Sequence, residues 1–563
     1  MKLLGGYATS RKTIGFARSG SELLHHYKSV TIIERIIDMS KKSPSRRKAN
    51  RYDYPLFISK ILFSGILILL QLGFLLFTYL KLREEYFYIQ AVLLLVSLLV
   101  VLHIINRPIN PAYKLAWCTT ILLSPIFGGL FYLVLSVNRT RKKFRKSIRD
   151  SVAVAKSHLH QEPEILEQIH SISKHASPQA AYIHNQAKYP VYPNTGVRYF
   201  ASGEEMFMCM LEELEKAEHF IFMEYFIVHE GAFWDSVLDI LKRKAREGVE
   251  VKMIYDDMGS ISTLPSKYYL ELREYGIECY CFNPFNPVLS LRLNNRDHRK
   301  ITVIDGHTSF TGGINLADEY INQLERFGYW KDTGVMIKGE ATWNFTVMFL
   351  QMWQHLSETT VDFERYHIPA SQFPAECRLE TDGFVQPYAD NPLFSEVVAE
   401  NVYLNMIHRA TSYIYITTPY LIVDNEMITA LVLAAQSGID VRIVTPGIPD
   451  KKTVFMMTRS FYEPLTKAGV KIYEYTPGFI HSKMMVVDDN YAVVGSINLD
   501  YRSLYLHFEC ATFLYHSKII NSIKEDIEDT ISDSKEITYE SCLNLNKPYR
   551  FWQGLLRLYA PLL

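Results

Sequence analysis

The sequence has few cysteines, and their spacing excludes two kinds of site. Only seven cysteines occur in 563 residues, scattered along the chain, and no CxxC pair is present. An even cysteine framework would indicate disulfides, and paired cysteines at short spacing would indicate structural zinc. We therefore expect neither a disulfide scaffold nor a metal site, and no cofactor.

The chain also lacks net charge. Lysine plus arginine and aspartate plus glutamate each number 60, and the isoelectric point is about 7.3. A general nucleic-acid binder usually carries a strong basic surplus, so we expect no nucleic-acid partner. The basic residues that do cluster lie in residues 1–55 and 139–149.

Charge is missing altogether from three neighbouring stretches, Ile61–Leu80, Tyr86–Ile105 and Leu115–Val137. About 20 apolar residues are enough for a helix to cross the hydrocarbon core of a bilayer. We therefore predict a transmembrane region over residues 56–137, with two or three helices, in a multi-pass integral membrane protein. Pro125 and the glycines after it also allow a re-entrant hairpin in the third stretch.

The orientation of this region stays open. The positive-inside rule favours a cytoplasmic position for both basic clusters, but three crossings place them on opposite sides. Either one stretch does not cross, or the basic N-terminal tail, residues 1–55, lies outside. Residues 138–189, which follow, are predicted to form linker helices.

Beyond residue 190 the sequence alternates between short β-rich runs and helical patterns. Such alternation indicates βαβ units around a largely parallel sheet, in an α/β fold. The order strand, helix, strand occurs twice, which predicts two domains, residues 190–365 and 366–563. The elements are Phe220–Phe226, Trp234–Arg246 and Val251–Tyr255 in the first copy, and Tyr413–Ile416, Met427–Gln436 and Val441–Val444 in the second.

The repeat is sharpest in five positions with identical spacing in both copies. Five fixed residues occur by chance at roughly 10⁻⁷ per register at average residue usage, so two occurrences are a specific signal. The positions are His298, Lys300, Asp305, Gly312 and Asn315 in the first copy, and His481, Lys483, Asp488, Gly495 and Asn498 in the second.

These residue types suit attack on a phosphodiester. On a strand, alternate side chains share a face, so His298 and Lys300 project together, as do His481 and Lys483. One imidazole attacks phosphorus to form a phosphohistidine, and the other protonates the leaving alkoxide.

Further polar residues complete the predicted site. The two lysines, with Asn315 and Asn498, hold the non-bridging oxygens. Asp305 and Asp488 complete the catalytic motifs, but they fall at turns, so we expect them to support the site structurally.

A neutral nucleophilic imidazole needs an acceptor for its second nitrogen. Asp332 and Glu509 follow the two motifs at comparable distances. We predict that these carboxylates orient the histidines.

The HxKxxxxD motif followed by GGxN or GSxN resembles the phospholipase D superfamily, and more narrowly the bacterial cardiolipin synthases. Supporting stretches include residues 110–117, 223–226, 255–260, 312–320 and 418–420. The resemblance implies two phospholipase D-like domains packed as a pseudo-twofold pair, with both motifs at their interface. It adds Gly313 and Ser496 to the substrate-binding set, makes His298 the nucleophile, and gives His481 the acid/base role.

The resemblance also implies a reaction and a location. A phosphatidyl group passes from one phosphatidylglycerol, through a phosphohistidine, to a second phosphatidylglycerol, giving cardiolipin and glycerol. The catalytic domains would lie at the cytoplasmic face of the bacterial cell membrane.

The motifs alone leave two alternatives open, and the oligomeric state with them. A phospholipase D hydrolase, or a phosphatidyltransferase to another alcohol, uses the same residues with a different acceptor. A catalytically inactive, lipid-binding membrane protein is the alternative from another class, although degenerate copies usually lose a His or Lys and both copies here are intact.

Overall fold

The computed structural model describes residues 86–124, 142–174, 176–193, 195–284, 295–377 and 382–562, with single positions at 69, 73, 76, 77, 129 and 132. The predicted basic tail, residues 1–55, and most of Ile61–Leu80 lie outside the described residues. The chain divides into two compact units, residues 1–48 and 49–563, and all described structure belongs to the second unit.

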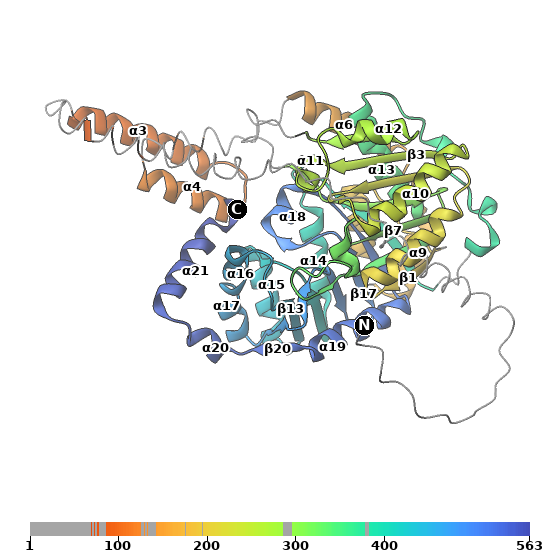
Figure 1. Cartoon of the computed structure of the whole chain (residues 1–563). Coiled ribbons are helices and arrows are strands. Elements are labelled where there is room, and N and C mark those ends of the chain that lie inside the picture. Colours follow the sequence, from red (N-terminus) through yellow and green to blue (C-terminus); the bar gives the residue numbers. More distant parts are fainter. Residues whose placement is uncertain are drawn as a thin grey trace, which may run out of the picture. The chain divides into compact units, whose positions relative to one another are not determined.

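Two large sheets, one in each half of the repeat, organise this unit (Figure 1). The first has the strand order β1-β9-β7-β6-β2-β3-β4. Its strands are β1 (Thr195–Phe200), β2 (Phe220–Tyr225), β3 (Glu250–Asp256), β4 (Glu278–Phe282), β6 (Lys300–Ile304), β7 (Thr308–Gly312) and β9 (Gly334–Gly339).

The second sheet repeats this order strand for strand, as β10-β19-β17-β16-β11-β13-β14, and adds β20 at one edge. The matching order is the tertiary counterpart of the sequence repeat. Its strands are β10 (Phe384–Asp390), β11 (Tyr413–Thr417), β13 (Asp440–Pro446), β14 (Lys471–Tyr475), β16 (Met484–Val487), β17 (Tyr491–Gly495), β19 (His507–Tyr515) and β20 (Ser534–Ile537).

The expectation of a largely parallel sheet is wrong. In the first sheet β2, β3 and β4 run parallel, whereas β6, β7, β9 and β1 pair antiparallel. The second sheet has the same division. The reason is local: only three residues join β6 to β7, and a connection this short permits only an antiparallel pair.

The individual elements predicted from periodicity are confirmed. The helix expected at Trp234–Arg246 is α10 (Ala232–Arg246), and the one at Met427–Gln436 is α15 (Asn425–Gln436). The strand predictions correspond to β2, β3, β11 and β13 within one or two residues. Asp424 begins α15 by accepting a hydrogen bond from the Met427 amide, which supplies a partner for a helix-end donor.

Helices cover both sheets. In the first half, α9 (Gly203–Glu215) and α10 lie on one face, and α13 (Thr342–Ser357) packs on the same sheet and also contacts β10 (Figure 1). Every α13 residue from Thr342 to Trp353 is buried, so this helix belongs to the core that the two halves share. The remaining short helices of this half are α11 (Asp257–Ser260) and α12 (Tyr268–Glu274).

The second half carries helices at corresponding places. Helix α14 (Val398–Arg409) contacts β10 and β16, and α19 (Ile519–Ser532) contacts β11, β14, β16 and β17. The others are α16 (Lys452–Arg459), α17 (Tyr462–Lys467), α18 (Tyr501–Tyr505) and α20 (Tyr539–Leu543).

The predicted linker region contains three helices that pack on the catalytic halves: α6 (Lys142–Lys156), α7 (Pro163–Ile172) and α8 (Ser177–Ala187). Ile148, Ile165 and Ile183, one on each helix, are buried in the shared core. The helical expectation is therefore confirmed. Most charged residues of this region lie on the exposed faces of these helices, whereas Ser151 and Gln179 are buried.

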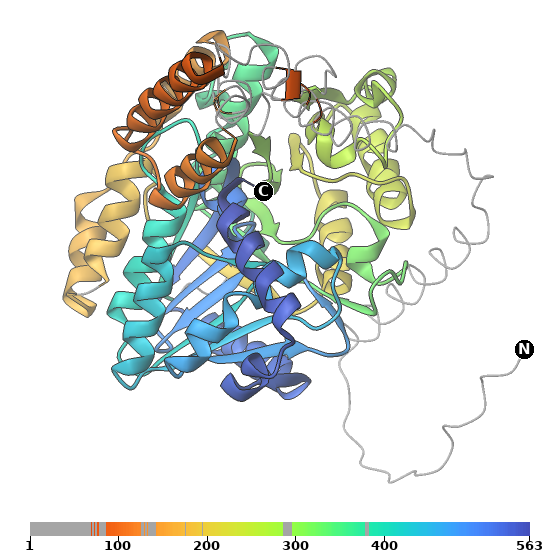
Figure 2. The same ribbon diagram turned by 90° about the vertical axis from the view of Figure 1, so that its left-hand side faces the viewer.

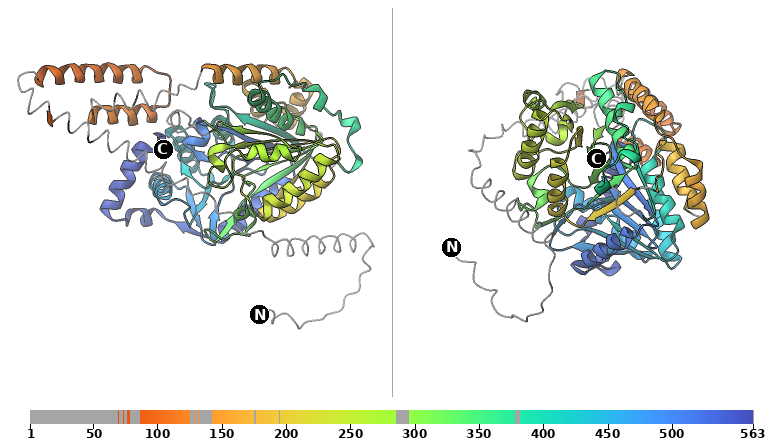
Figure 3. Two further views of the ribbon diagram at one scale, coloured as in Figure 1. Left: turned by 45° about the horizontal axis from the view of Figure 1, so that its top comes forward. Right: turned by 90° about the vertical axis from the view of Figure 1, so that its right-hand side faces the viewer.

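Among the described residues of the predicted transmembrane region, two helices are complete: α3 (Tyr86–Ile105) and α4 (Pro111–Leu123), which lie side by side (Figure 3). Val101 and Ile104 pack against Trp117 and Ile121 between them. Over the described residues, no helix reaches the combined length and apolar character needed for a bilayer crossing.

Asn110 ties α4 to the second catalytic half. Its Oδ1 caps the helix by accepting from the Ala112 amide, and its Nδ2 donates to Asp424 Oδ2 and to Tyr505 Oη, both at 3.0 Å. Tyr505 in turn donates to Asp424 and contacts Glu400. A polar node therefore fixes the start of α4 beside α15 and α18.

The chain ends in α21 (Lys547–Tyr559) and a short 3-10 helix, Ala560–Leu562, both in contact with α4 (Figure 2). Gln553 is buried on α21, whereas Phe551 and Trp552 are 69% and 55% exposed. This helix therefore presents aromatic rings to its surroundings beside α4.

Candidate active site

Each His-x-Lys triplet lies between a short strand that pairs with the other half and a longer strand of its own sheet. A prediction placed them within strands, but β6 begins only at Lys300, and β16 begins after Lys483. The residues just before each triplet form two short strands, β5 (Arg296–Asp297) and β15 (Gly478–Ile480).

These short strands pair with the opposite half. Strand β5 pairs in parallel with β19, and β15 pairs in parallel with β8 (Tyr329–Lys331). The His298 amide donates to Phe508, and the His481 amide donates to Lys331. Each histidine therefore sits at a crossover between the halves, and the triplets are extended links rather than strand interiors.

Each histidine contacts the predicted orienting carboxylate of the other half, an arrangement that we call the carboxylate exchange. His298 Nδ1 lies 3.0 Å from both carboxylate oxygens of Glu509, and His481 Nδ1 lies 2.7 Å from Asp332 Oδ2. Ionised carboxylates only accept, so each Nδ1 is the donor and each Nε2 is free of its proton. Both carboxylates are fully buried.

Burial lowers the pKa of both imidazoles, so they are neutral near neutral pH. The pKa of His298 falls to about 3 and that of His481 to about 4, with burial as the largest cause in each case. Burial by itself raises the pKa of Glu509, but His298 and His507 together outweigh this effect and lower it. The rings thus have the protonation state that nucleophilic attack requires.

The two lysines link the motifs electrostatically. Burial lowers the pKa of Lys300 to about 8 and that of Lys483 to about 7. The charge of Lys300 acts on both His481 and Lys483, which belong to the other half. The two motifs therefore share one electrostatic environment.

The lysine ammonium groups are held close to their own histidines. Lys300 Nζ donates to the His298 carbonyl at 2.6 Å, and Lys483 Nζ donates to the His481 carbonyl. Lys483 Nζ also lies 2.8 Å from His481 Nδ1. Because His481 Nδ1 donates its proton to Asp332, it does not accept from Lys483, and this approach is a contact rather than a hydrogen bond.

Asp305 and Asp488 have the predicted structural task. Asp305 accepts hydrogen bonds from the backbone amides of residues 218–220, and Asp488 accepts from those of residues 411–413. Each fixes the start of the neighbouring strand, β2 or β11. Both adopt positive φ at the turn that ends the motif strand, which Asp tolerates better than most residues.

The asparagines also hold the local backbone and side chains. Asn315 accepts from the Ile227 amide at 3.0 Å and donates to Tyr320 Oη at 2.7 Å. Asn498 Nδ2 donates to Ser503, and its buried Oδ1 has no hydrogen-bond partner among the described residues. Their contact with substrate oxygens stays a prediction.

Gly313 and Ser496 occupy equivalent places but act differently. A Cβ on Gly313 would lie 2.1 Å from Asp332 Oδ1, so glycine leaves the room that this carboxylate needs. Ser496 Oγ instead donates to Glu509 Oε2. In both halves the motif therefore supports the carboxylate that orients a histidine. Direct contact of either residue with substrate stays a prediction.

Arg299, between His298 and Lys300, turns away from the site. Its guanidinium contacts Glu224 at 2.5 Å and Asp297 at 3.0 Å, and all three side chains are buried. Removal of one partner from such a cluster leaves an uncompensated buried charge. The cluster holds the backbone beneath the first triplet.

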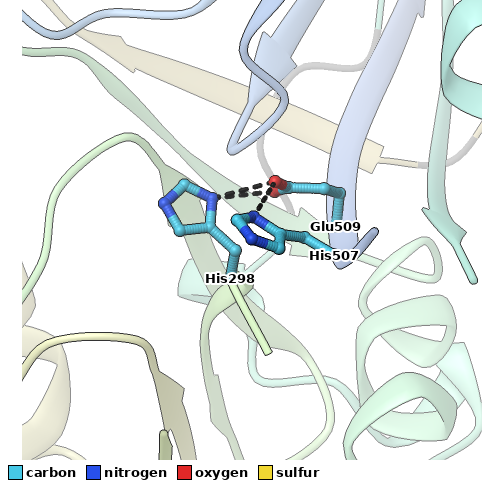
Figure 4. A group of neighbouring side chains, drawn as sticks. All are labelled: His298, His507 and Glu509. Carbon is cyan, nitrogen blue, oxygen red and sulfur yellow. Dashed lines mark hydrogen bonds and ion pairs between the residues drawn. The ribbon is translucent and has the colours of Figure 1, made fainter. Parts of the chain in front are cut away.

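No role was predicted for His507 from its place in the sequence. Its ring lies 5.6 Å from that of His298, and its Nδ1 lies 3.7 Å from Glu509 Oε1 (Figure 4). The signal was present: on β19, alternate residues share a face, so His507 must point the same way as Glu509. The equivalent residue of the first half is Trp330, whose ring lies 5.3 Å from that of His481.

Of the described residues, one group has spacing suited to a metal ion: His298, His507 and Glu509, whose ligand atoms lie within 4.8 Å of one another. Aromatic rings also pack against the two histidines of the motifs. Phe226 lies edge-on to His298 at 4.9 Å, and Tyr320 lies edge-on to His481 at 5.5 Å.

Two equivalent halves, each with a neutral histidine, a lysine and a carboxylate supplied by the other half, define a phosphodiester-transfer site of the phospholipase D type. A family model described as "Cardiolipin synthase, PLD-like domain" matches residues 210–353 and 403–531, and a model of the phospholipase D–nuclease N-terminal region matches residues 95–136.

Individual relatives agree with these models. A cardiolipin synthase from Geobacillus sp. (strain WCH70) is 38% identical over 81% of this chain and 89% of its own length. An uncharacterized protein from Streptococcus mutans serotype c is 45% identical over 82% of this chain and 99% of its own length. The chain belongs to the cardiolipin synthase family with phospholipase D-like domains.

A solved structure shares the fold. Phosphatidylserine synthase from Haemophilus influenzae Rd KW20 aligns with 68% of this chain and 97% of its own, with a TM-score of 0.50 and 17% identity.

Proposed function

We propose that this protein is a phosphatidyltransferase that makes cardiolipin and glycerol from two molecules of phosphatidylglycerol. The observation that carries the proposal is the exchange of Glu509 and Asp332 between the halves. This exchange gives each histidine a fixed tautomer in one shared site. Identity to cardiolipin synthases over most of the chain supports the choice of lipid.

In the first step, Nε2 of His298 attacks the phosphorus of one phosphatidylglycerol. A phosphorus–nitrogen bond forms, and the bond to the headgroup glycerol oxygen breaks. The anionic phosphodiester raises the proton affinity of His481, which as imidazolium gives its proton to the leaving oxygen. Free glycerol departs, and His481 is left neutral.

In the second step, the neutral His481 takes the proton of a headgroup hydroxyl from a second phosphatidylglycerol. The hydroxyl oxygen attacks phosphorus, and the bond to His298 breaks. Lys300 and Lys483 offset the negative charge on the non-bridging oxygens in both transition states. Cardiolipin leaves with His298 neutral again, and the proton taken by His481 is kept for the next donor lipid or released to water.

The test is the product spectrum with a defined lipid. Purified full-length protein in phosphatidylglycerol vesicles should convert headgroup-labelled lipid to cardiolipin and release labelled glycerol. His298→Ala and His481→Ala should each abolish both products, while His408→Ala, at an exposed position on α14, should not. If the wild-type protein made mainly phosphatidic acid, the protein would be a phospholipase D hydrolase and not a cardiolipin synthase.

We also infer that the apolar N-terminal region anchors the enzyme in the bacterial membrane, with the catalytic halves at the cytoplasmic face. Leucines on α3 and α4 are largely exposed in the described structure, which favours lipid as their surroundings. Multi-pass insertion of the predicted transmembrane region is the finer form of this inference.

Two further features support contact with a membrane. Helix α6 exposes Lys142, Lys143, Arg145, Lys146 and Arg149, which suit anionic headgroups. Helix α21 exposes Phe551 and Trp552, which suit the interface. Alkaline extraction should leave the protein in the membrane pellet, and release to the supernatant would contradict integral anchoring.

A further inference from the structure

The active site is asymmetric at one position. His507 stands beside His298, whereas Trp330 stands at the equivalent place beside His481. The His507 side chain is only 10% exposed, and neither of its ring nitrogens has a hydrogen-bond partner among the described residues. A ligand that binds these nitrogens would supply the missing hydrogen-bonding or coordinating partner.

We propose that His298, His507 and Glu509 form a binding site for a zinc-class divalent cation, and that occupancy of this site inhibits the transfer reaction. The inhibition rests on the proposed function, whereas the binding does not. Two imidazoles and one carboxylate are a ligand set that zinc commonly takes in proteins.

The spacing of the three ligands fits such an ion. Ligands at 2.0–2.1 Å from a tetrahedral metal are separated by about 3.4 Å. Glu509 lies 3.0 Å from His298 Nδ1 and 3.7 Å from His507 Nδ1, on either side of that value (Figure 4). Side-chain rotations that draw the three ligand atoms together, from separations of at most 4.8 Å, would complete the coordination. Nitrogen ligands favour zinc, cobalt and copper, whereas magnesium and calcium prefer oxygen.

Binding inhibits because it changes the tautomer of His298. In the metal-free site Nδ1 carries the proton and donates to Glu509, so Nε2 has a free lone pair. A metal on Nδ1 needs the lone pair of that nitrogen, and a neutral imidazole then carries its proton on Nε2. The nitrogen that attacks phosphorus is blocked, and Glu509 no longer orients the ring.

In the other half, Trp330 at the position equivalent to His507 excludes metal binding at His481. Trp330 offers a ring without a lone pair for a metal, so His481 and Asp332 supply only two ligands there. The proposal therefore assigns the effect to one residue, His507, which takes no part in the mechanism given above.

The binding experiment uses the metal alone. The full-length protein, stripped with EDTA, is titrated with Co²⁺ and Zn²⁺. Co²⁺ should give the visible absorption of a low-coordinate site, and Zn²⁺ should displace it. His507→Gln should weaken binding by at least about tenfold, and His298→Ala should do the same, whereas the surface control His408→Gln should not.

The activity experiment compares the same variants. Zn²⁺ should inhibit cardiolipin formation by the wild type, Mg²⁺ should not, and EDTA should restore activity. His507→Gln should resist Zn²⁺, with the activity of each variant measured relative to its own metal-free rate. His507→Asn serves as a second variant if the first does not fold.

Either of two results overturns the proposal. One is a wild-type protein that gives no Co²⁺ absorption. The other is equal inhibition by Zn²⁺ of the wild type and of both His507 variants. A protein that binds Co²⁺ through His507 but makes no cardiolipin would instead refute the proposed function and leave the site intact.

Discussion

The exchanged carboxylates predict that each half of the sequence controls the histidine of the other half. The perturbation is Asp332→Asn compared with Glu509→Gln. Both changes keep the shape of a fully buried side chain and remove its charge. Asp332 lies in the first half but contacts His481, and Glu509 lies in the second half but contacts His298.

The expected loss in kcat follows from the change in the histidine tautomer. An amide that donates toward Nδ1 forces the proton onto Nε2, the atom that must react. The same exchange in a serine-protease triad lowers kcat by about 10⁴-fold. The 2.7 Å contact of Asp332 with His481 and the 3.0 Å contacts of Glu509 with His298 are of the same kind, so each single variant should lose about 10³–10⁴-fold in kcat.

An assay with a phosphatidyl ester of p-nitrophenol distinguishes Asp332→Asn from Glu509→Gln. The nitrophenolate leaves without needing a proton. Asp332→Asn impairs the acid/base His481 but leaves the nucleophile His298 intact. It should therefore give a burst of nitrophenolate and retain labelled phosphohistidine. Glu509→Gln impairs the nucleophile, and it should give neither.

Double variants supply the control. His298→Ala combined with Glu509→Gln should be no slower than His298→Ala alone, because the two residues act as one unit. Equal bursts from the two carboxylate variants would refute the reasoning. If only the Glu509→Gln variant gave a burst, His481 would be the nucleophile and His298 the acid/base.

Three further predictions follow from the same structure. Gly313→Ala should lower kcat by about 10–100-fold, because its Cβ would displace Asp332 Oδ1 from 2.1 Å away; unchanged kcat in steady-state assays would contradict this. In the free enzyme, kcat/KM should decline as pH rises through about 7, because burial lowers the pKa of Lys483 to about 7 and its ammonium is lost above that value; a flat profile between about pH 6 and 9 would argue against a charged Lys483 in the reaction. Replacing Phe551 and Trp552 with Ser should weaken binding of the protein to phosphatidylglycerol vesicles in flotation assays without changing kcat in detergent. Unaltered flotation would show that α21 does not contact the membrane.

Much of the site could be predicted because its signal is local. The His-x-Lys spacing fixes which side chains share a face, and the turn chemistry of Asp305 and Asp488 fixes their structural role. The carboxylates could be identified as candidates because each follows its motif at a comparable distance. Their exchange could not be predicted, because spacing along the chain contains no information about which half supplies the partner.

Other features depended on packing between distant segments. The mixed sheets follow from hairpins such as β6–β7, and the polar helices α6, α7 and α8 turned out to bury one face in the shared core. His507 gained its place beside His298 only when β5 paired with β19.

The sequence by itself determined the chemistry: two histidines, two lysines and their supporting acids, repeated with one spacing, because side-chain periodicity is a local property of the backbone. Only the tertiary structure decided which acid serves which histidine and which ring stands beside each. Those choices arise from strand pairing between the halves, where hydrogen bonds join residues about 150 to 210 positions apart.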